Sequence, residues 1–131
     1  MTSQPGDINV LSYTSQIPFA RHLGFELTKF EGGEAEIRYT ARPEHLNTFD
    51  VTHGGACMTL LDITMAAAAR SQTPEIGVVT IEMKTSFMQP SVGPLHARGR
   101  GHGDVEHRHA RATVRHVEGV QVLGLRGVAK L

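Results

Sequence analysis

A carboxylate and two glycines in one apolar segment are the residues best suited to chemistry. Asp62 lies in the middle of a segment that runs from Gly54 to Arg70, contains no proline and is rich in strong helix formers. The segment is apolar almost all the way round, which is typical of a helix inside a fold. An unpaired carboxylate there costs several kcal/mol, or its pKa shifts until it is neutral. We therefore expect a site to use Asp62; the alternative is a partly exposed Asp62 that pairs with an arginine.

One narrow stripe of this predicted helix is small or polar along its length. At about 100° per residue, the stripe consists of Gly55, Thr59, Asp62, Ala66 and Ala69. Such a surface lets another backbone or a ligand approach closely, with one charged group at its centre.

Gly54 and Gly55 open the segment, where the first backbone N–H groups of a helix have no partner within it. Without side chains in the way, these donors and the positive end of the helix dipole can meet a carbonyl oxygen that is becoming negative. This pattern is compatible with an oxyanion hole at the helix start. An equally simple interpretation is that paired glycines let the chain turn tightly into the helix.

The spacing of these groups predicts more than one chain in the site. Asp62 lies eight residues beyond Gly54, so the standard rise per residue separates them by roughly 12 Å along the axis. Reacting groups approach to about 3 Å, so the two residues of one chain cannot both act on one carbonyl group. We therefore predict a homodimer with paired sites, each combining the helix start of one subunit with Asp62 of the other.

Composition limits the classes of function. The chain has 131 residues, which favours one domain, and we expect residues 1–15 to be a flexible leader and residues 16–131 a single domain. Thirteen basic side chains balance thirteen acidic ones, which argues against binding nucleic acid or an anionic membrane surface. A single cysteine excludes an internal disulfide and fits a reducing cytosol. Because the sequence has neither a secretory signal nor a convincing membrane span, we expect a cytoplasmic protein.

Hydrophobic periodicity and turn residues predict the elements around the long helix. A short helix is expected at residues 15–23, with Gly24 at its end. Residues 25–30 and 34–40 alternate around two glycines and predict a hairpin. Residues 42–53 are expected to form a loop. Further strands are predicted at residues 76–87, 95–100, 110–117 and 120–129.

The order of two strands, one long helix and about four strands suggests an α+β fold, an antiparallel sheet curled around a central helix. In residues 76–87, we expect Val79, Ile81, Met83 and Phe87 on one face of the strand and Thr80, Glu82 and Lys84 on the other. Residues 101–109 fit this architecture poorly, because only Val105 among them is clearly apolar. They are interpreted as an exposed edge, a loop or a disordered excursion.

The sequence resembles a known family at several motifs. These are Asn47, Thr52-His53-Gly54-Gly55, Thr59-Leu60-Leu61-Asp62, Val79-Thr80-Ile81-Glu82-Met83 and Phe87-Met88-Gln89-Pro90, with Pro18-Phe19 and Leu23-Gly24 near the start. Together they resemble the hotdog-fold acyl-CoA thioesterases of the phenylacetate-pathway type, over about residues 16–100. The resemblance implies a hotdog fold, a curved antiparallel sheet wrapped around one long central helix, assembled as a dimer and often as a dimer of dimers. Residues 101–109 depart from the family pattern.

The resemblance also implies roles for five residues. Asn47 and Gly54 would bind and polarise the thioester carbonyl, Asp62 would act as general base or nucleophile, and Thr80 would help to place water. For His53 two interpretations stay open: a hydrogen bond near the carbonyl, or a structural cap at the helix start.

Other residues carry weaker signals. Cys57 lies near the helix start, four residues after His53, and imitates a Cys/His nucleophile pair, although a lone cysteine in an apolar helix is usually packing. Arg98 and Arg100 are either contacts for coenzyme A phosphates or ordinary surface charges. His102, His107 and His109 lack a further ligand at a recognisable spacing, so no metal site is expected. Three glycines at residues 99–103 imitate a phosphate-binding loop, but no helix follows them.

The function favoured by these patterns is hydrolysis of an acyl-CoA thioester to a free acid and coenzyme A. No cofactor is expected, since coenzyme A is part of the substrate, and neither nucleic acid nor membrane is an expected partner. Two alternatives stay open: a hotdog hydratase or dehydratase acting on acyl thioesters, and a non-catalytic acyl-CoA-binding protein. The acyl group itself is not predicted.

Overall fold

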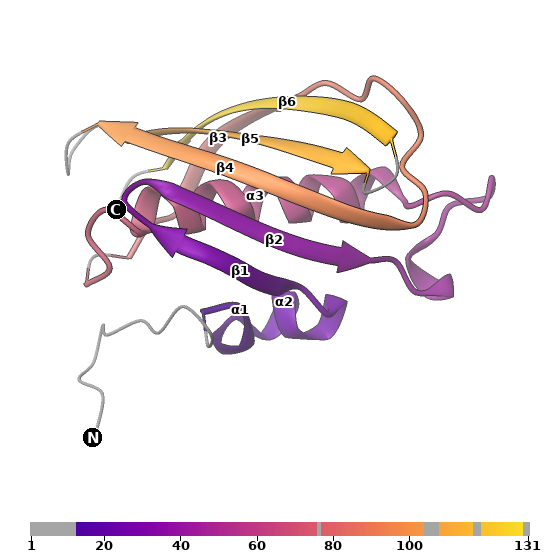
Figure 1. The fold of residues 1–131 in the computed structure, drawn as a ribbon, viewed down its shortest axis with the longest axis horizontal. Coiled ribbons are helices and arrows are strands. Elements are labelled where there is room, and N and C mark those ends of the chain that lie inside the picture. Colours follow the sequence, from indigo (N-terminus) through magenta and orange to yellow (C-terminus); the bar gives the residue numbers. More distant parts are fainter. Residues whose placement is uncertain (1–12, 76, 104–107, 117–118, 130–131) are drawn as a thin grey trace.

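A six-stranded antiparallel sheet curves over one long helix, α3 (Gly54–Arg70) (Figure 1). The computed structural model describes residues 13–75, 77–103, 108–116 and 119–129. The strand order is β1-β2-β4-β5-β6-β3, and every neighbouring pair is antiparallel. This α+β architecture confirms the fold that the sequence predicts.

The elements also follow the predicted order along the chain. They are α1 (Tyr13–Gln16), α2 (Pro18–Leu23), β1 (Glu26–Glu31), β2 (Glu34–Thr40), a 3-10 turn (Pro43–His45), α3, β3 (Thr80–Thr85), β4 (Pro94–Gly103), β5 (Arg108–His116) and β6 (Gly119–Ala129). The bounds of α3 agree with the prediction.

The N-terminal helices differ from the prediction at one point. The predicted helix at residues 15–23 is two helices, and α1 takes in the last residues of the predicted leader. Tyr13 is buried and its ring stacks on Phe30 with 5.2 Å between centroids. Residues 1–12 of the leader lie outside the described part of the chain. As predicted, Pro18 is in the first turn of α2 and Gly24 ends it in the left-handed conformation, at φ 78°.

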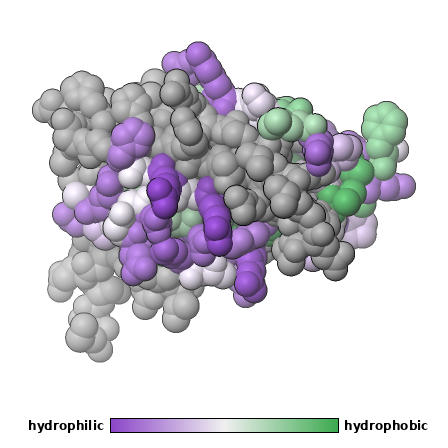
Figure 2. Space-filling view, turned by 45° about the horizontal axis from the view of Figure 1, so that its top comes forward, coloured by the Kyte–Doolittle hydropathy of each residue, from purple (hydrophilic) through white to green (hydrophobic). Residues whose placement is uncertain are grey.

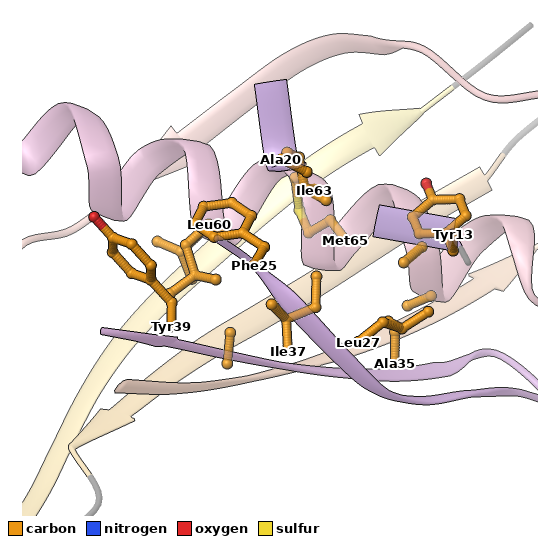
Figure 3. Close-up of a cluster of buried hydrophobic side chains, with 14 of the residues drawn as sticks. Tyr13, Ala20, Phe25, Leu27, Ala35, Ile37, Tyr39, Leu60, Ile63 and Met65 are labelled. Carbon is orange, nitrogen blue, oxygen red and sulfur yellow. The ribbon is translucent and has the colours of Figure 1, made fainter. Parts of the chain in front are cut away.

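The hydrophobic core lies between α3 and the concave side of the sheet (Figure 3). Ile37 and Tyr39 of β2 meet Leu60 and Met65 of α3 there, and all four are buried. The opposite stripe of α3 is more open in the single chain: Gly55 and Met58 are exposed, and Asp62 and Ala66 are half-buried. Within the described residues, the helix is therefore not enclosed on every side, because the part of the stripe from Gly55 to Ala66 is only partly covered.

Strand β4 crosses α3 at two glycines that allow a very close approach. A Cβ atom on Gly99 would lie 2.7 Å from the backbone oxygen of Thr64, and one on Gly101 would lie 2.7 Å from Cα of Ala69. Real Cβ atoms do not approach this closely, so the glycines and the alanines of α3 permit the contact together. These glycines serve packing, and Ala69 of the predicted stripe faces the sheet and is fully buried.

Residues 101–103 and 108–109 lie in strands, where the sequence suggested an edge, a loop or disorder. β4 continues through Gly103, and β5 begins at Arg108, with His102 opposite His109. Arg108 and His109 pair with β4 on one side and with β6 on the other, whereas the pairing of β4 with β2 ends at Arg100. Close packing accounts for the missing apolar side chain at Gly101, because a Cβ atom there would lie 2.7 Å from Cα of Ala69. Residues 104–107 lie outside the described residues.

Strand β3 is shorter than predicted, and its faces differ from the predicted alternation. A register irregularity between Thr80 and Glu82 marks a β-bulge against β6. A bulge inserts one residue and shifts the side-chain alternation. Thr80 therefore faces α3, as does Met83, although the regular alternation placed them on opposite faces. Val79 and Phe87 lie outside the strand and are exposed.

Within the described residues, none of the helices is long and apolar enough to cross a lipid bilayer.

Candidate active site

The start of α3 leaves one backbone donor without an acceptor. His53 precedes the helix, and its Nδ1 atom accepts a hydrogen bond from Gly55 N at 2.8 Å. The carbonyl oxygen of His53 accepts from Ala56 N at 2.9 Å and from Cys57 N at 3.1 Å. Among the described residues, Gly54 N finds no acceptor. Of the first N–H groups of the helix, Gly54 therefore supplies the one that a ligand can use.

The two glycines are explained by space and not by backbone conformation. Neither has a positive φ, which removes the tight-turn interpretation. A Cβ atom on Gly55 would lie 3.1 Å from Nδ1 of His53 and would crowd this cap. On Gly54, it would lie 3.4 Å from the ring of Phe87. The pair thus admits the His53 cap on one side and an aromatic ring on the other.

The structure gives His53 the role of helix cap. Because Nδ1 accepts from a backbone N–H, the neutral ring carries its proton on Nε2. The ring is exposed and lines a hollow beside the helix start. The cap interpretation of His53 is therefore supported, and its second nitrogen keeps a donor that faces away from the cap.

Asn47 organises the loop in front of α3. Its Oδ1 atom accepts from Phe49 N at 2.8 Å and from Val51 N at 3.3 Å, and its backbone N donates to Val51 O at 2.9 Å. The side-chain oxygen is therefore committed to the turn. Among the described residues, the side-chain NH₂ has no acceptor, so a carbonyl oxygen can receive its hydrogen bond.

Asp62 has one hydroxyl partner and opens into a hollow. Thr80 Oγ1 donates to Asp62 Oδ1 at 2.5 Å. The carboxylate is half-buried at the edge of a cavity of about 350 Å³, and its other lining residues are mostly apolar: Ile17, Phe19, Met58, Thr59, Ile63 and Met83. The ion pairs of the described residues involve other carboxylates. The alternative of an Asp62–arginine pair therefore has no support among the described residues, and in the single chain the carboxylate is half-buried.

One chain does not bring the candidate residues into one cluster. Asp62 and Thr80 meet in the middle of α3, whereas Gly54 and His53 lie at its start and Asn47 in the preceding loop. Helical rise alone separates Gly54 from Asp62 by roughly 12 Å.

A buried histidine that the sequence did not single out supports the loop. His45 Nδ1 lies 2.8 Å from the hydroxyl of Tyr39 and accepts from Arg42 N at 3.2 Å. Its carbonyl oxygen accepts from His53 N at 2.9 Å. Burial lowers the pKa of His45, so the ring is neutral at physiological pH. His45 thus links Tyr39 in the core to His53, the residue that caps α3. In the sequence, the only signal for this role is the position of His45 two residues before Asn47.

Cys57 belongs to the core. It is buried, and burial raises the pKa of its thiol, an effect that a hydrogen bond with Ser91 partly offsets. A protonated, enclosed thiol is a poor nucleophile. The geometry therefore favours packing as the role of Cys57.

The remaining weak candidates lie away from this region. Arg98 pairs with Glu36 at 2.8 Å and Arg100 with Glu34 at 3.2 Å, on the sheet face that points away from α3. Among the described residues, no three His, Cys, Asp or Glu side chains gather as metal ligands; His107 lies outside those residues.

Figure 2 shows hydrophobic side chains gathered at the end of the molecule that carries the start of α3, where the exposed apolar residues include Phe49, Phe87 and Met88.

Comparison with known proteins supports this architecture. The structure is similar to the PaaI protein of the phenylacetic acid degradation operon of Escherichia coli (TM-score 0.80, 21% identity, covering 92% of this chain and 94% of that one). It is also similar to thioesterase HI1161 of Haemophilus influenzae (TM-score 0.80, 18% identity, covering 95% and 91%). These likenesses establish the hotdog fold.

Sequence comparison matches the chain to curated relatives and to one family model. A protein of Saccharolobus solfataricus named "Putative esterase SSO2140" is 30% identical over 81 residues, which are 61% of this chain and 58% of that protein. The chain thus spans less than two thirds of the length of the curated relatives it matches. The model of a domain of unknown function, DUF4442, matches residues 9–123. The chain therefore belongs to the DUF4442 family, on a hotdog fold.

Proposed function

We propose that this protein hydrolyses an acyl-CoA thioester to a free acid and coenzyme A, as a homodimer with shared active sites. The observation that carries the proposal is the Thr80–Asp62 hydrogen bond at the edge of an apolar hollow. A carboxylate that is fixed by a hydroxyl and faces an apolar cavity suits general-base or nucleophilic chemistry on an apolar ester. The names of the H. influenzae and S. solfataricus relatives, a thioesterase and an esterase, agree with this reaction class.

The proposed reaction begins with the thioester carbonyl oxygen at the start of one subunit's α3. Gly54 N–H donates to this oxygen, and the NH₂ group of Asn47 assists. Both donors are without an acceptor among the described residues. Fixed backbone donors in this position stabilise the negative charge that develops on the oxygen.

Asp62 of the partner subunit then supports the attack on the carbonyl carbon. It takes a proton from a water molecule whose oxygen forms the new C–O bond, the C–S bond breaks, and the thiolate of coenzyme A takes up a proton. The hydroxyl of Thr80 donates a hydrogen bond to Asp62, so the lone pairs of its oxygen are available to accept a hydrogen bond from that water. In the alternative route a carboxylate oxygen of Asp62 itself attacks the carbon, the C–S bond breaks and releases the thiolate of coenzyme A, and water then hydrolyses the resulting anhydride.

The distance between Gly54 and Asp62 within one chain means that a site that uses both residues needs two subunits. One chain separates Gly54 from Asp62 by roughly 12 Å along α3. The open stripe of α3, with Met58 exposed beside the half-buried Asp62, supplies a surface that a second copy can approach. A twofold arrangement supplies both sites at once.

Thiol release from a panel of acyl-CoA substrates tests the proposal, with wild type and Asp62→Asn compared. We expect hydrolysis by the wild type and a loss of roughly a hundredfold to ten-thousandfold in kcat for the variant, at unchanged circular dichroism. Near-wild-type turnover by Asp62→Asn would refute the assignment. Tight binding of acyl-CoA without thiol release would indicate a binding protein instead.

Single turnover in oxygen-18 water separates the two routes, because only direct attack places label in the carboxylate of Asp62.

A further inference from the structure

Two hollows follow each other along α3. The first, of about 350 Å³, contains Asp62. The second, of about 230 Å³, lies toward the helix start, where its lining combines apolar residues such as Leu23, Leu46 and Ala56 with the polar residues Glu44, His45 and His53. Small-molecule sites have volumes of roughly 300–1,000 Å³. The first hollow thus suits a small group by itself, and the second is an extension and not a separate site.

Phe19 and Thr59 line both hollows and therefore form the boundary between them. The hydroxyl of Thr59 donates to Gly55 O in its own helix at 2.8 Å, so this group is committed to the backbone. The ring of Phe19 lies in the first turn of α2 and is 55% exposed. Because this ring lies largely outside the hydrophobic core, packing in the core does not explain its position. Phe19 is thus the adjustable part of the boundary.

The lining of the first hollow indicates the chemistry of its occupant. Apart from Asp62 and Thr59, its lining residues are aliphatic, aromatic or methionine side chains. A charged occupant would lose hydration there without a partner. An anionic occupant would in addition be repelled by the Asp62 carboxylate. The hollow is therefore suited to an uncharged, apolar chain.

We propose that the hollow beside Asp62 binds the acyl group of the substrate, and that the ring of Phe19 limits the length of this group by closing the way to the second hollow. The substrates are then thioesters of uncharged, short to medium aliphatic acids. This inference rests on the proposed thioester hydrolysis. It identifies Phe19 as a residue that determines specificity, and it excludes dicarboxylic acyl groups as substrates.

The test is the chain-length profile of kcat/KM for straight-chain acyl-CoA esters from butyryl to palmitoyl, with succinyl-CoA as the charged comparison. Phe19→Ala joins the two hollows, and Phe19→Trp fills more of the boundary. We expect Phe19→Ala to raise the kcat/KM ratio of long to short chains by at least about tenfold, and Phe19→Trp to lower it. Succinyl-CoA should be a poor substrate for the wild type. Val92→Ala, at an exposed apolar residue that lines neither hollow, is the control and should keep the wild-type profile.

The opposite shifts separate specificity from damage to the fold, because a destabilised protein loses activity toward all chain lengths together. Thermal melting of each variant checks that it is folded. If the wild type hydrolyses acyl-CoA but neither Phe19 variant changes the profile, the role of Phe19 is refuted while the proposed function stands. If succinyl-CoA is hydrolysed as well as butyryl-CoA, the apolar assignment of the hollow is wrong. If the wild type releases no thiol from any ester, the proposed function itself fails, and this inference fails with it.

Discussion

Thr80 donates a hydrogen bond of 2.5 Å to Asp62, which joins an edge strand to the middle of the central helix. The bond depends on the bulge in β3, because a regular strand would turn Thr80 to the face opposite Met83. One local irregularity thus aims the hydroxyl at the carboxylate. Its consequences for the proposed reaction can be tested residue by residue.

Thr80→Val should reduce hydrolysis more than Thr80→Ser. Valine keeps the shape of threonine but removes the hydroxyl, so both the hydrogen bond to Asp62 and the contact for water are lost. Serine keeps the hydroxyl. We expect a fall in kcat of about tenfold or more for valine, equivalent to at least about 1.4 kcal/mol in the barrier, and a small change for serine. Equal activities of the two variants would contradict the role of the hydroxyl.

Gly54→Pro removes a single hydrogen-bond donor from the start of α3. Proline is well tolerated at the first helical position, and the extended ψ of His53, 138°, suits a residue before proline. Loss of one oxyanion donor lowers kcat by roughly a hundredfold to a thousandfold. Gly54→Ala keeps the N–H group and is the matched control. Comparable kcat values for the two variants would show that the Gly54 amide does not take part.

Mixing two inactive variants should restore activity if the site is shared between subunits. In a heterodimer of Asp62→Asn and Gly54→Pro chains, one site carries both changes and the other carries neither. Random exchange of equal amounts should therefore recover about a quarter of the wild-type specific activity by subunit statistics. Unfolding and refolding the mixture, followed by thiol-release assays, measures this recovery. A mixture that remains inactive, or a wild type that sediments as an active monomer, would place the whole site in one chain.

His45 should make the stability of the protein sensitive to acid. Its pKa is lowered in the folded protein by burial, so the unfolded chain binds a proton at this ring more readily. The free energy of unfolding should therefore fall as pH decreases through the ordinary value of 6.5 toward the lowered one. His45→Asn, whose amide oxygen can replace Nδ1 as acceptor, should lose less stability over this range. Urea unfolding of both proteins at a series of pH values makes the comparison, and parallel curves would contradict it.

Gly99→Ala should destabilise the fold without a direct effect on chemistry. The added Cβ would lie 2.7 Å from the backbone oxygen of Thr64, so β4 or α3 has to move. Overpacking of this kind costs roughly 1–3 kcal/mol. Gly54→Ala is a useful comparison, since its Cβ would approach only a partly exposed aromatic ring, at 3.4 Å. Chemical denaturation should rank Gly99→Ala as clearly less stable than Gly54→Ala.

Local patterns in the sequence determined most of the elements. The bounds of α3, the β1–β2 hairpin and the order of the elements along the chain agree with predictions from periodicity, glycines and prolines. The anomaly of a carboxylate in an apolar helix identified Asp62, and the paired glycines identified the helix start. These signals are readable because each depends on residues that are close together along the chain.

Contacts between distant segments were decided by the tertiary structure alone. Thr80 reaches Asp62 across eighteen positions of sequence through a bulge that periodicity does not reveal. His53 accepts the hydrogen bond of the Gly55 N–H, while the Gly54 N–H has no acceptor in the part of the chain that the structure describes; only the cap geometry distinguishes the two. Phe19 became a candidate for specificity because the fold places it at both hollows beside α3. The chain around Gly101 looked unsuited to a packed strand because Gly99 and Gly101 contact α3 by lacking side chains, and a hydrophobic pattern cannot record that kind of contact.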